Sequence, residues 1–66
     1  MIILGIDPGL AIVGWGVIDY EKSHFRVLGF GSIQTPAHTP VEDRLLQIYN
    51  ELGELIERFH PEWMAV

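Results

Sequence analysis

The acidic residue at position 7 has the clearest chemical potential in this 66-residue sequence. Asp7 ends an apolar run, residues 2–6, and is followed at once by Pro8 and Gly9. Such a run predicts a central strand buried on both faces, where a carboxylate is costly unless a partner compensates it. Pro8 and Gly9 suit the two central positions of a type II turn. The pattern therefore predicts one negative charge at the end of a sheet, where open-sheet proteins hold ligands and metals.

Two interpretations of Asp7 remain open from the residues alone. The carboxylate could bind a metal ion, since Mg²⁺ prefers hard oxygen ligands. It could instead shape the turn by accepting a hydrogen bond from the backbone N–H two residues further on. The three histidines show no metal-ligand spacing, and we expect surface or capping positions for them: His24, His38 and His60.

Composition restricts the classes of function. The net charge is −5, with nine acids against four scattered bases, which argues against this segment as a nucleic-acid-binding surface. Cysteine is absent, so neither a disulfide framework nor a thiolate zinc site is possible. We find no transmembrane run and no basic segment before the first apolar stretch, so a soluble, cytoplasmic protein is expected.

The elements that must position Asp7 begin with three strands, over residues 2–7, 11–20 and 25–35. The short connections between them, including the polar turn 20–24, favour an antiparallel meander. Asp19 then ends the second strand far from Asp7. Trp15, in the same strand, is interpreted as a core aromatic rather than as a platform for stacked bases.

A helix and a fourth strand follow. Thr39 is predicted as the N-cap of a capping box with Glu42, and Pro40 as the first helical residue. Apolar residues then recur at helical spacing until Pro61 ends the helix near His60. The segment from residue 62 onward reads as the start of a strand that runs parallel in the same sheet. Glu62, at its beginning, is therefore expected at the opposite end from Asp7.

Two glycine pairs lie within the second and third strands. Each pair occupies one face of its strand, because side chains alternate with period two: Gly14 with Gly16, and Gly29 with Gly31. Glycines in strands mark bulges or close approach by another backbone. We favour close packing of a helix or a bulge; the alternative is a smooth patch for a substrate backbone.

The sequence IILGIDPGLAIVGWGVID resembles the opening of the RuvC family, the bacterial Holliday-junction resolvases. Asp-Pro-Gly ends the first strand, and a Gly-aromatic-Gly-Val-Ile pattern follows at residues 14–18. A glycine-containing strand, a helix, a proline and a strand similar to the family's P-x-x-x-A-[IV]-E complete the likeness. The resemblance implies an α/β, ribonuclease-H-like fold. It further implies that residues 1–66 are the N-terminal part of a single nuclease domain and end within the fourth strand.

The resemblance also implies a function. The expected activity is a Mg²⁺-dependent endonuclease that resolves Holliday junctions by paired symmetric nicks in recombination and DNA repair. About four carboxylates would hold two Mg²⁺ ions, which Mn²⁺ can replace. Asp7 matches the first carboxylate, and the second is a Glu directly after the position of Val66. Four-way junction DNA, a second copy of the chain and the RuvA–RuvB complex are the implied partners. This chain alone is expected to be inactive.

The sequence leaves three other interpretations open. A nucleotide-binding domain of the actin, Hsp70 or sugar-kinase type also begins with a strand, an Asp and a glycine turn, but its turn is usually rich in Thr or Ser. Residues 10–12 are Leu-Ala-Ile and contain neither. A RuvC-like nuclease of the YqgF type would act on RNA instead. The chain could also serve only as a structural or assembly module.

Overall fold

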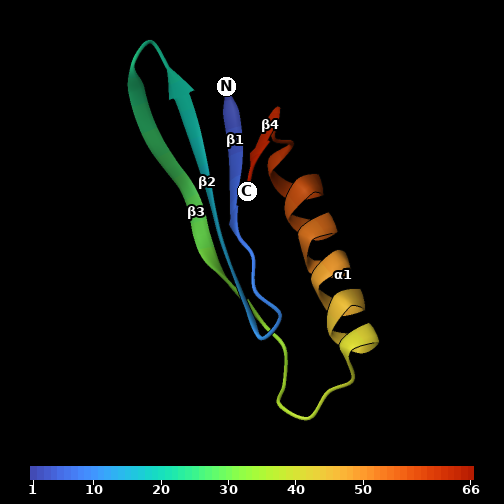
Figure 1. Cartoon of the computed structure of the whole chain (residues 1–66). Helices are drawn as coiled ribbons and strands as arrows, with labels where there is room; N and C mark the ends of the chain where they lie inside the picture. Colours follow the sequence, from blue (N-terminus) through green and yellow to red (C-terminus); the bar gives the residue numbers. More distant parts are fainter.

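The computed structural model describes all residues from Met1 to Val66 as one mixed sheet and one helix. The elements are β1 (Ile2–Asp7), β2 (Ile12–Glu21), β3 (His24–Gln34), α1 (Val41–Phe59) and β4 (Trp63–Ala65). The strand order is β3-β2-β1-β4; β1, β2 and β3 pair antiparallel, whereas β4 pairs parallel with β1 (Figure 1). The predicted meander, crossover helix and parallel fourth strand are thus confirmed.

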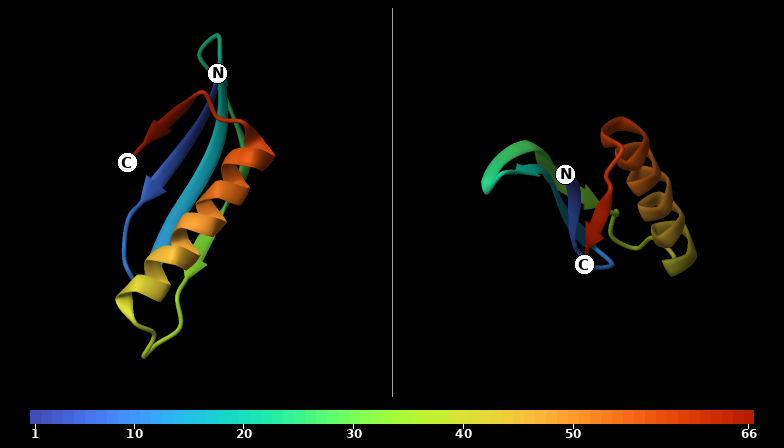
Figure 2. Two further views of the ribbon diagram at one scale, coloured as in Figure 1. Left: turned by 90° about the vertical axis from the view of Figure 1, so that its right-hand side faces the viewer. Right: turned by 90° about the horizontal axis from the view of Figure 1, so that it is seen from above.

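Helix α1 covers one face of the sheet, and nothing covers the other (Figure 2). The small core lies between them and consists of four sheet residues and one helix residue: Leu4, Val13, Val17, Ile33 and Leu55. The prediction that β1 is buried on both faces is therefore wrong. Only Leu4 of this strand is fully buried, because the chain supplies a helix for one side of the sheet alone.

We call the uncovered side the open face. Because paired residues share a face and side chains alternate along each strand, the strand register defines its members. They are Ile3, Gly5 and Asp7 of β1; Ile12, Gly14, Gly16, Ile18 and Tyr20 of β2; Phe25, Val27, Phe30, Ser32 and Gln34 of β3; and Trp63 and Ala65 of β4.

The β2–β3 hairpin contains a tight turn and a bulge. Lys22 and Ser23 form the turn, both with positive φ, 49° and 66°. The register shifts after Val17 pairs with Gly29, so Leu28 is the extra residue of the bulge. A bulge increases local twist, and Figure 1 shows β3 curving along β2 at this end of the sheet.

The start of α1 differs from the predicted capping box. Pro40, not Thr39, is the N-cap residue: its ψ of 148° is extended, and no side chain caps the helix. The backbone N–H groups of Asp43 and Arg44 donate to the Pro40 carbonyl at 3.1 and 3.0 Å. At the other end, His60 caps the helix in a left-handed conformation and its N–H donates to the Ile56 carbonyl. The predicted end of the helix and the capping position of His60 are confirmed.

Trp15 joins the helix to the sheet, as predicted for a core aromatic. Its ring lies 6.1 Å from that of Phe59, centroid to centroid. A Cβ added at Gly31 would stand 3.1 Å from the indole, and one at Gly29 would stand 3.0 Å from the Phe59 ring. The β3 glycines are therefore packing glycines, which confirms the favoured interpretation for this pair. The β2 pair differs, since a Cβ at Gly16 would meet nothing within 4 Å.

Candidate functional site

Asp7 is the last residue of β1. The strands β1, β3 and β4 run in the same direction, so their carboxyl ends, and Asp7 with them, lie at the same end of the sheet (Figure 1). Its side chain is exposed on the open face and pairs across to Gly14 of β2. The carboxylate accepts no hydrogen bond and forms no ion pair within the chain. The hydrogen bond from the backbone N–H two residues on, which the interpretation of Asp7 as a turn-former requires, is therefore not formed. Exposure also removes the burial cost that the sequence pattern suggested.

The loop after Asp7 depends on Gly9 for a reason other than the predicted type II turn. No glycine in the chain has a positive φ, which the third position of a type II turn would require. A Cβ at Gly9 would instead collide with the carbonyl oxygen of Ile12. Gly9 is therefore needed for close approach, because the chain folds back against its own backbone immediately after Asp7.

Thr35 fixes this loop from the end of β3. Its side chain is buried, and its hydroxyl donates to the Leu10 carbonyl at 2.8 Å. Its backbone N–H donates to the Ala11 carbonyl at 2.9 Å. Because Leu10 and Ala11 follow Asp7 closely, Thr35 helps to hold the segment that positions the carboxylate. From sequence, Thr35 is predictable only as the end of a strand, because a lone threonine there gives no further signal.

Two other acids lie at the far end of the sheet, as predicted. Asp19 accepts from the N-terminal amine of Met1 at 3.3 Å and lies 3.8 Å from the Arg26 guanidinium. Glu62 accepts a hydrogen bond from the Ile2 backbone N–H at 3.3 Å. Both have structural partners beside the start of β1, so neither joins Asp7. No three potential ligands among His, Cys, Asp and Glu cluster anywhere in the chain.

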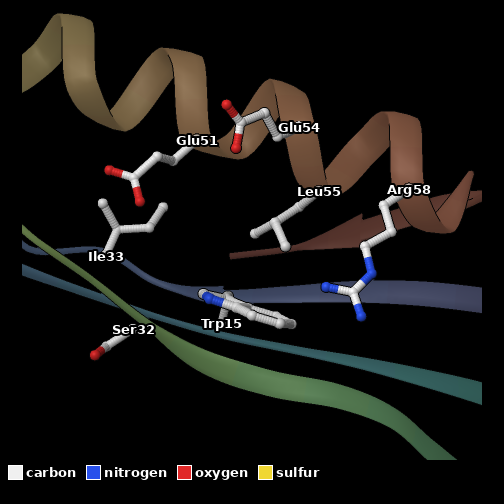
Figure 3. Close-up of a pocket in the computed structure, with 7 residues that line it drawn as sticks. All are labelled: Trp15, Ser32, Ile33, Glu51, Glu54, Leu55 and Arg58. Carbon is white, nitrogen blue, oxygen red and sulfur yellow. The ribbon is translucent and has the colours of Figure 1, made fainter.

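The helix-covered side of the sheet contains a polar pocket between α1 and β3 (Figure 3). Its lining includes Trp15, Glu51, Glu54 and Arg58. Glu51 already accepts a hydrogen bond from Gln47 at 2.7 Å, and Figure 3 shows Ser32 pointing away from the helix, towards the open face. This pocket and Asp7 therefore belong to opposite sides of the sheet.

The chemistry available at Asp7 is that of one free carboxylate. Its oxygens are hard ligands of the kind that Mg²⁺ selects, and no side chain of the chain competes for them. Leu10, Ala11 and Ile12, which follow, offer no hydroxyl to a nucleotide phosphate. One carboxylate does not enclose a metal ion, so this chain fits a divalent metal site as a contributor of a single ligand.

Comparison with known proteins identifies the group to which this arrangement belongs. Residues 3–66 match the family model of the crossover junction endodeoxyribonuclease RuvC. Proteins of that name from Alkaliphilus oremlandii and Brevibacillus brevis are 50% and 53% identical over all 66 residues. The chain spans about 40% of the length of these relatives.

Solved structures agree with the sequence matches. The whole chain superposes on RuvC of T. thermophilus in complex with a Holliday junction substrate, with a TM-score of 0.92 and 34% identity, and covers 42% of that chain. A second Thermus thermophilus RuvC structure gives a TM-score of 0.91 at 33% identity. The fold is accordingly ribonuclease-H-like, and the chain belongs to the RuvC family of crossover junction endodeoxyribonucleases.

Proposed function

We propose that this chain is the N-terminal part of a nuclease domain that resolves Holliday junctions by paired symmetric nicks in recombination and DNA repair. Family membership over residues 3–66 supports the reaction class. The proposed active site rests on one observation, the free carboxylate of Asp7 at the carboxyl end of β1. The substrate is four-way junction DNA, and the RuvC of T. thermophilus has been solved with such a substrate. The reaction takes place in the cytoplasm, where bacterial chromosomal DNA lies.

Asp7 is proposed to be a catalytic metal ligand. The strand register supports a second carboxylate beside it: Gly5 pairs with Ala65, so two positions further along each strand Asp7 aligns with the position after Val66. The family pattern has a Glu there. Two Mg²⁺ ions, or Mn²⁺, would stabilise the attacking and leaving oxygens of the phosphodiester. Asp7 would contribute one carboxylate to that site, and the Thr35–Leu10 hydrogen bond would help to orient it.

The proposed assembly is a homodimer that works with the RuvA–RuvB branch-migration complex. Two symmetric nicks require two active sites related by twofold symmetry, and most homo-oligomers are closed and symmetric. A dimer satisfies this requirement with the smallest number of chains.

The test uses a chimera in which this chain is joined at Val66 to the C-terminal part of the Alkaliphilus oremlandii relative, beyond the region matched here. The chimera should nick a synthetic four-way junction symmetrically in Mg²⁺. Asp7→Asn keeps the size and removes the charge, so cleavage should fall at least about 100-fold while junction binding is retained.

Three controls make the result specific. The 66-residue chain alone should not cut, because it brings one carboxylate. Calorimetry with ATP should show no binding; micromolar affinity would instead favour a nucleotide-binding domain. A structured RNA offered in place of the junction should remain intact. Unchanged cleavage by the Asp7→Asn chimera would refute the role of Asp7.

A further inference from the structure

One side of β3 has no neighbouring strand, because β3 comes first in the strand order β3-β2-β1-β4. The N–H of Thr35 donates to the Ala11 carbonyl, so these two residues form a hydrogen-bonded pair at the end of the β2–β3 ladder. Hydrogen-bonded and non-hydrogen-bonded pairs alternate along an antiparallel ladder. The register therefore directs the backbone N–H and C=O groups of Phe30, Ser32 and Gln34 away from β2, towards the side without a neighbour.

Residues 29–33 of this side, which we call the free edge, are open to a further strand. At one end, the bulge at Leu28 interrupts regular pairing. At the other end, the side-chain amide of Gln47 donates to the Gln34 carbonyl at 2.9 Å, and so takes the place that a neighbouring strand would fill. The outward backbone groups between these two ends have no hydrogen-bond partner in the chain. Unpaired backbone groups of this kind are a template for strand addition by another chain.

The polar pocket of Figure 3 lies beside the free edge, on the helix-covered side of the sheet. Its volume is about 250 Å³, which suits one long side chain rather than a small-molecule ligand. The Trp15 indole lies over Gly31, where a Cβ would stand 3.1 Å from it, so no side chain at Gly31 screens the indole from the edge. Glu51 reaches towards the sheet, and one of its carboxylate oxygens has no hydrogen-bond partner. An added strand would meet both groups with the side chain that it places opposite Gly31.

The charges around the pocket favour a basic side chain as its occupant. Glu51 and Glu54 line the pocket with Arg58 as the one cation, and the Arg58 guanidinium lies over the Phe59 ring, 4.9 Å from its centroid. A Lys or Arg placed opposite Gly31 would meet a carboxylate and an indole, which both attract cations. The net charge of −5 attracts a basic segment to the chain as a whole.

A strand from a partner protein suits this edge better than a second copy of β3. If two copies paired through their free edges, each would place one of its own helix-side residues opposite Gly31. Those residues are Gly29, Gly31 and Ile33, and none of them carries a charge. Self-pairing would therefore leave Glu51 without a cation.

We propose that the free edge binds an extended segment of a partner protein as an additional antiparallel strand, and that a Lys or Arg of this segment enters the pocket between Trp15 and Glu51. The residues before and after this basic residue pair with Ser32 and Phe30, so a hydroxyl and an aromatic ring are their cross-strand neighbours. The partner motif is accordingly Thr or Ser, then a basic residue, then Val or Ile. This inference goes beyond the proposed reaction and does not depend on nuclease activity.

The first test measures peptide binding to the chimera by fluorescence polarisation. The probe is a labelled, end-capped peptide of nine β-forming residues with Thr-Lys-Val at its centre, and the matched peptide has Glu in place of Lys. The Lys peptide should bind at least about tenfold more tightly, because like charges brought together in an interface are costly. Equal affinities, or no binding of either peptide, would overturn the proposal.

Two variants of the chimera test whether the pocket receives the basic side chain. Glu51→Gln removes one charge and keeps an acceptor for Gln47, so the Lys peptide should bind about fivefold more weakly. Glu57→Gln removes the same charge from an exposed position of α1 outside the pocket and should leave the affinity unchanged. Equal losses in the two variants would show a general effect of net charge and contradict the proposed pocket.

The last test follows the free edge by amide hydrogen exchange, measured with NMR on the chimera. Peptide binding should slow exchange of the outward N–H groups of Phe30 and Ser32 at least about tenfold. The N–H of Gly31, which already bonds to β2, should not change. Protection of Phe30 and Ser32 before any peptide is added would mean that the remainder of the chain occupies this edge, and would refute the docking site. No readout involves cleavage, so failure of the proposed reaction would leave these tests intact.

Discussion

At the scale of single residues, Gly9 shows that a glycine can be required for a different physical reason from the one its sequence pattern indicates. The sequence pattern attributed Gly9 to a turn with positive φ, but the φ of Gly9 is not positive. Glycine is needed because the Ile12 carbonyl occupies the place of a Cβ. The dipeptide thus marked the right location in the chain, whereas the cause depends on a backbone contact that only the folded loop reveals.

The substitution Gly9→Ala is expected to destabilise the chimera by about 1–3 kcal/mol, since the backbone must shift to admit a methyl group. Urea denaturation of the chimera measures the change. Gly53→Ala serves as the control, because it adds a methyl in open space and should stabilise the helix by about 0.5–1 kcal/mol. Equal effects at the two positions would show that close approach at Gly9 is unimportant.

At the scale of elements, the β2–β3 hairpin has a turn whose residues do not match its conformation. Lys22 and Ser23 both have positive φ, as the central residues of type I′ turns do, and that turn favours Asn-Gly. A left-handed conformation costs a non-glycine residue about 1–2 kcal/mol. The double substitution Lys22→Asn with Ser23→Gly should therefore raise the melting temperature of the chimera by about 2–4 °C. Ser23→Ala retains a Cβ and should give no gain; a gain there would contradict the explanation.

Most elements were predictable because apolar periodicity and proline positions act locally. The first three strands and the helix lie within one residue of the predicted bounds, and the short β4 begins one residue later than predicted. The N-cap lies one residue later than predicted, at Pro40, because Pro40 takes an extended ψ, and the predicted capping box does not form. The bulge at Leu28 and the hydrogen bond from Thr35 to Leu10 arise from pairing between distant segments. Asp7 could be located as a strand end from sequence, but its exposure follows from an uncovered face that no local pattern encodes.

At the scale of the whole molecule, the chain is thin and extended. Its radius of gyration is 12.9 Å and its dimensions are 45 × 17 × 15 Å, whereas a compact domain of this length would have a radius of about 11 Å. Only six of 66 residues are buried. A two-layer body with so small a core leaves apolar surface exposed on both sides: the open face, and the outer flank of α1 around Tyr49, which is 75% exposed.

This exposure predicts that the isolated chain self-associates. Substituting one surface at a time shows whether the contact between copies uses the open face or the outer flank of α1. The open face presents the larger set of aromatic side chains, so we expect it to dominate. Phe30→Lys should shift the chain towards monomer in sedimentation velocity at a concentration where the unsubstituted chain is associated, because burying an unpaired ammonium in the contact is costly. Tyr49→Lys introduces the same charge on α1 and should leave association nearly unchanged. Dissociation by Tyr49→Lys alone would assign the contact to the helix flank. A monomeric unsubstituted chain would show that the exposed apolar surface does not drive association.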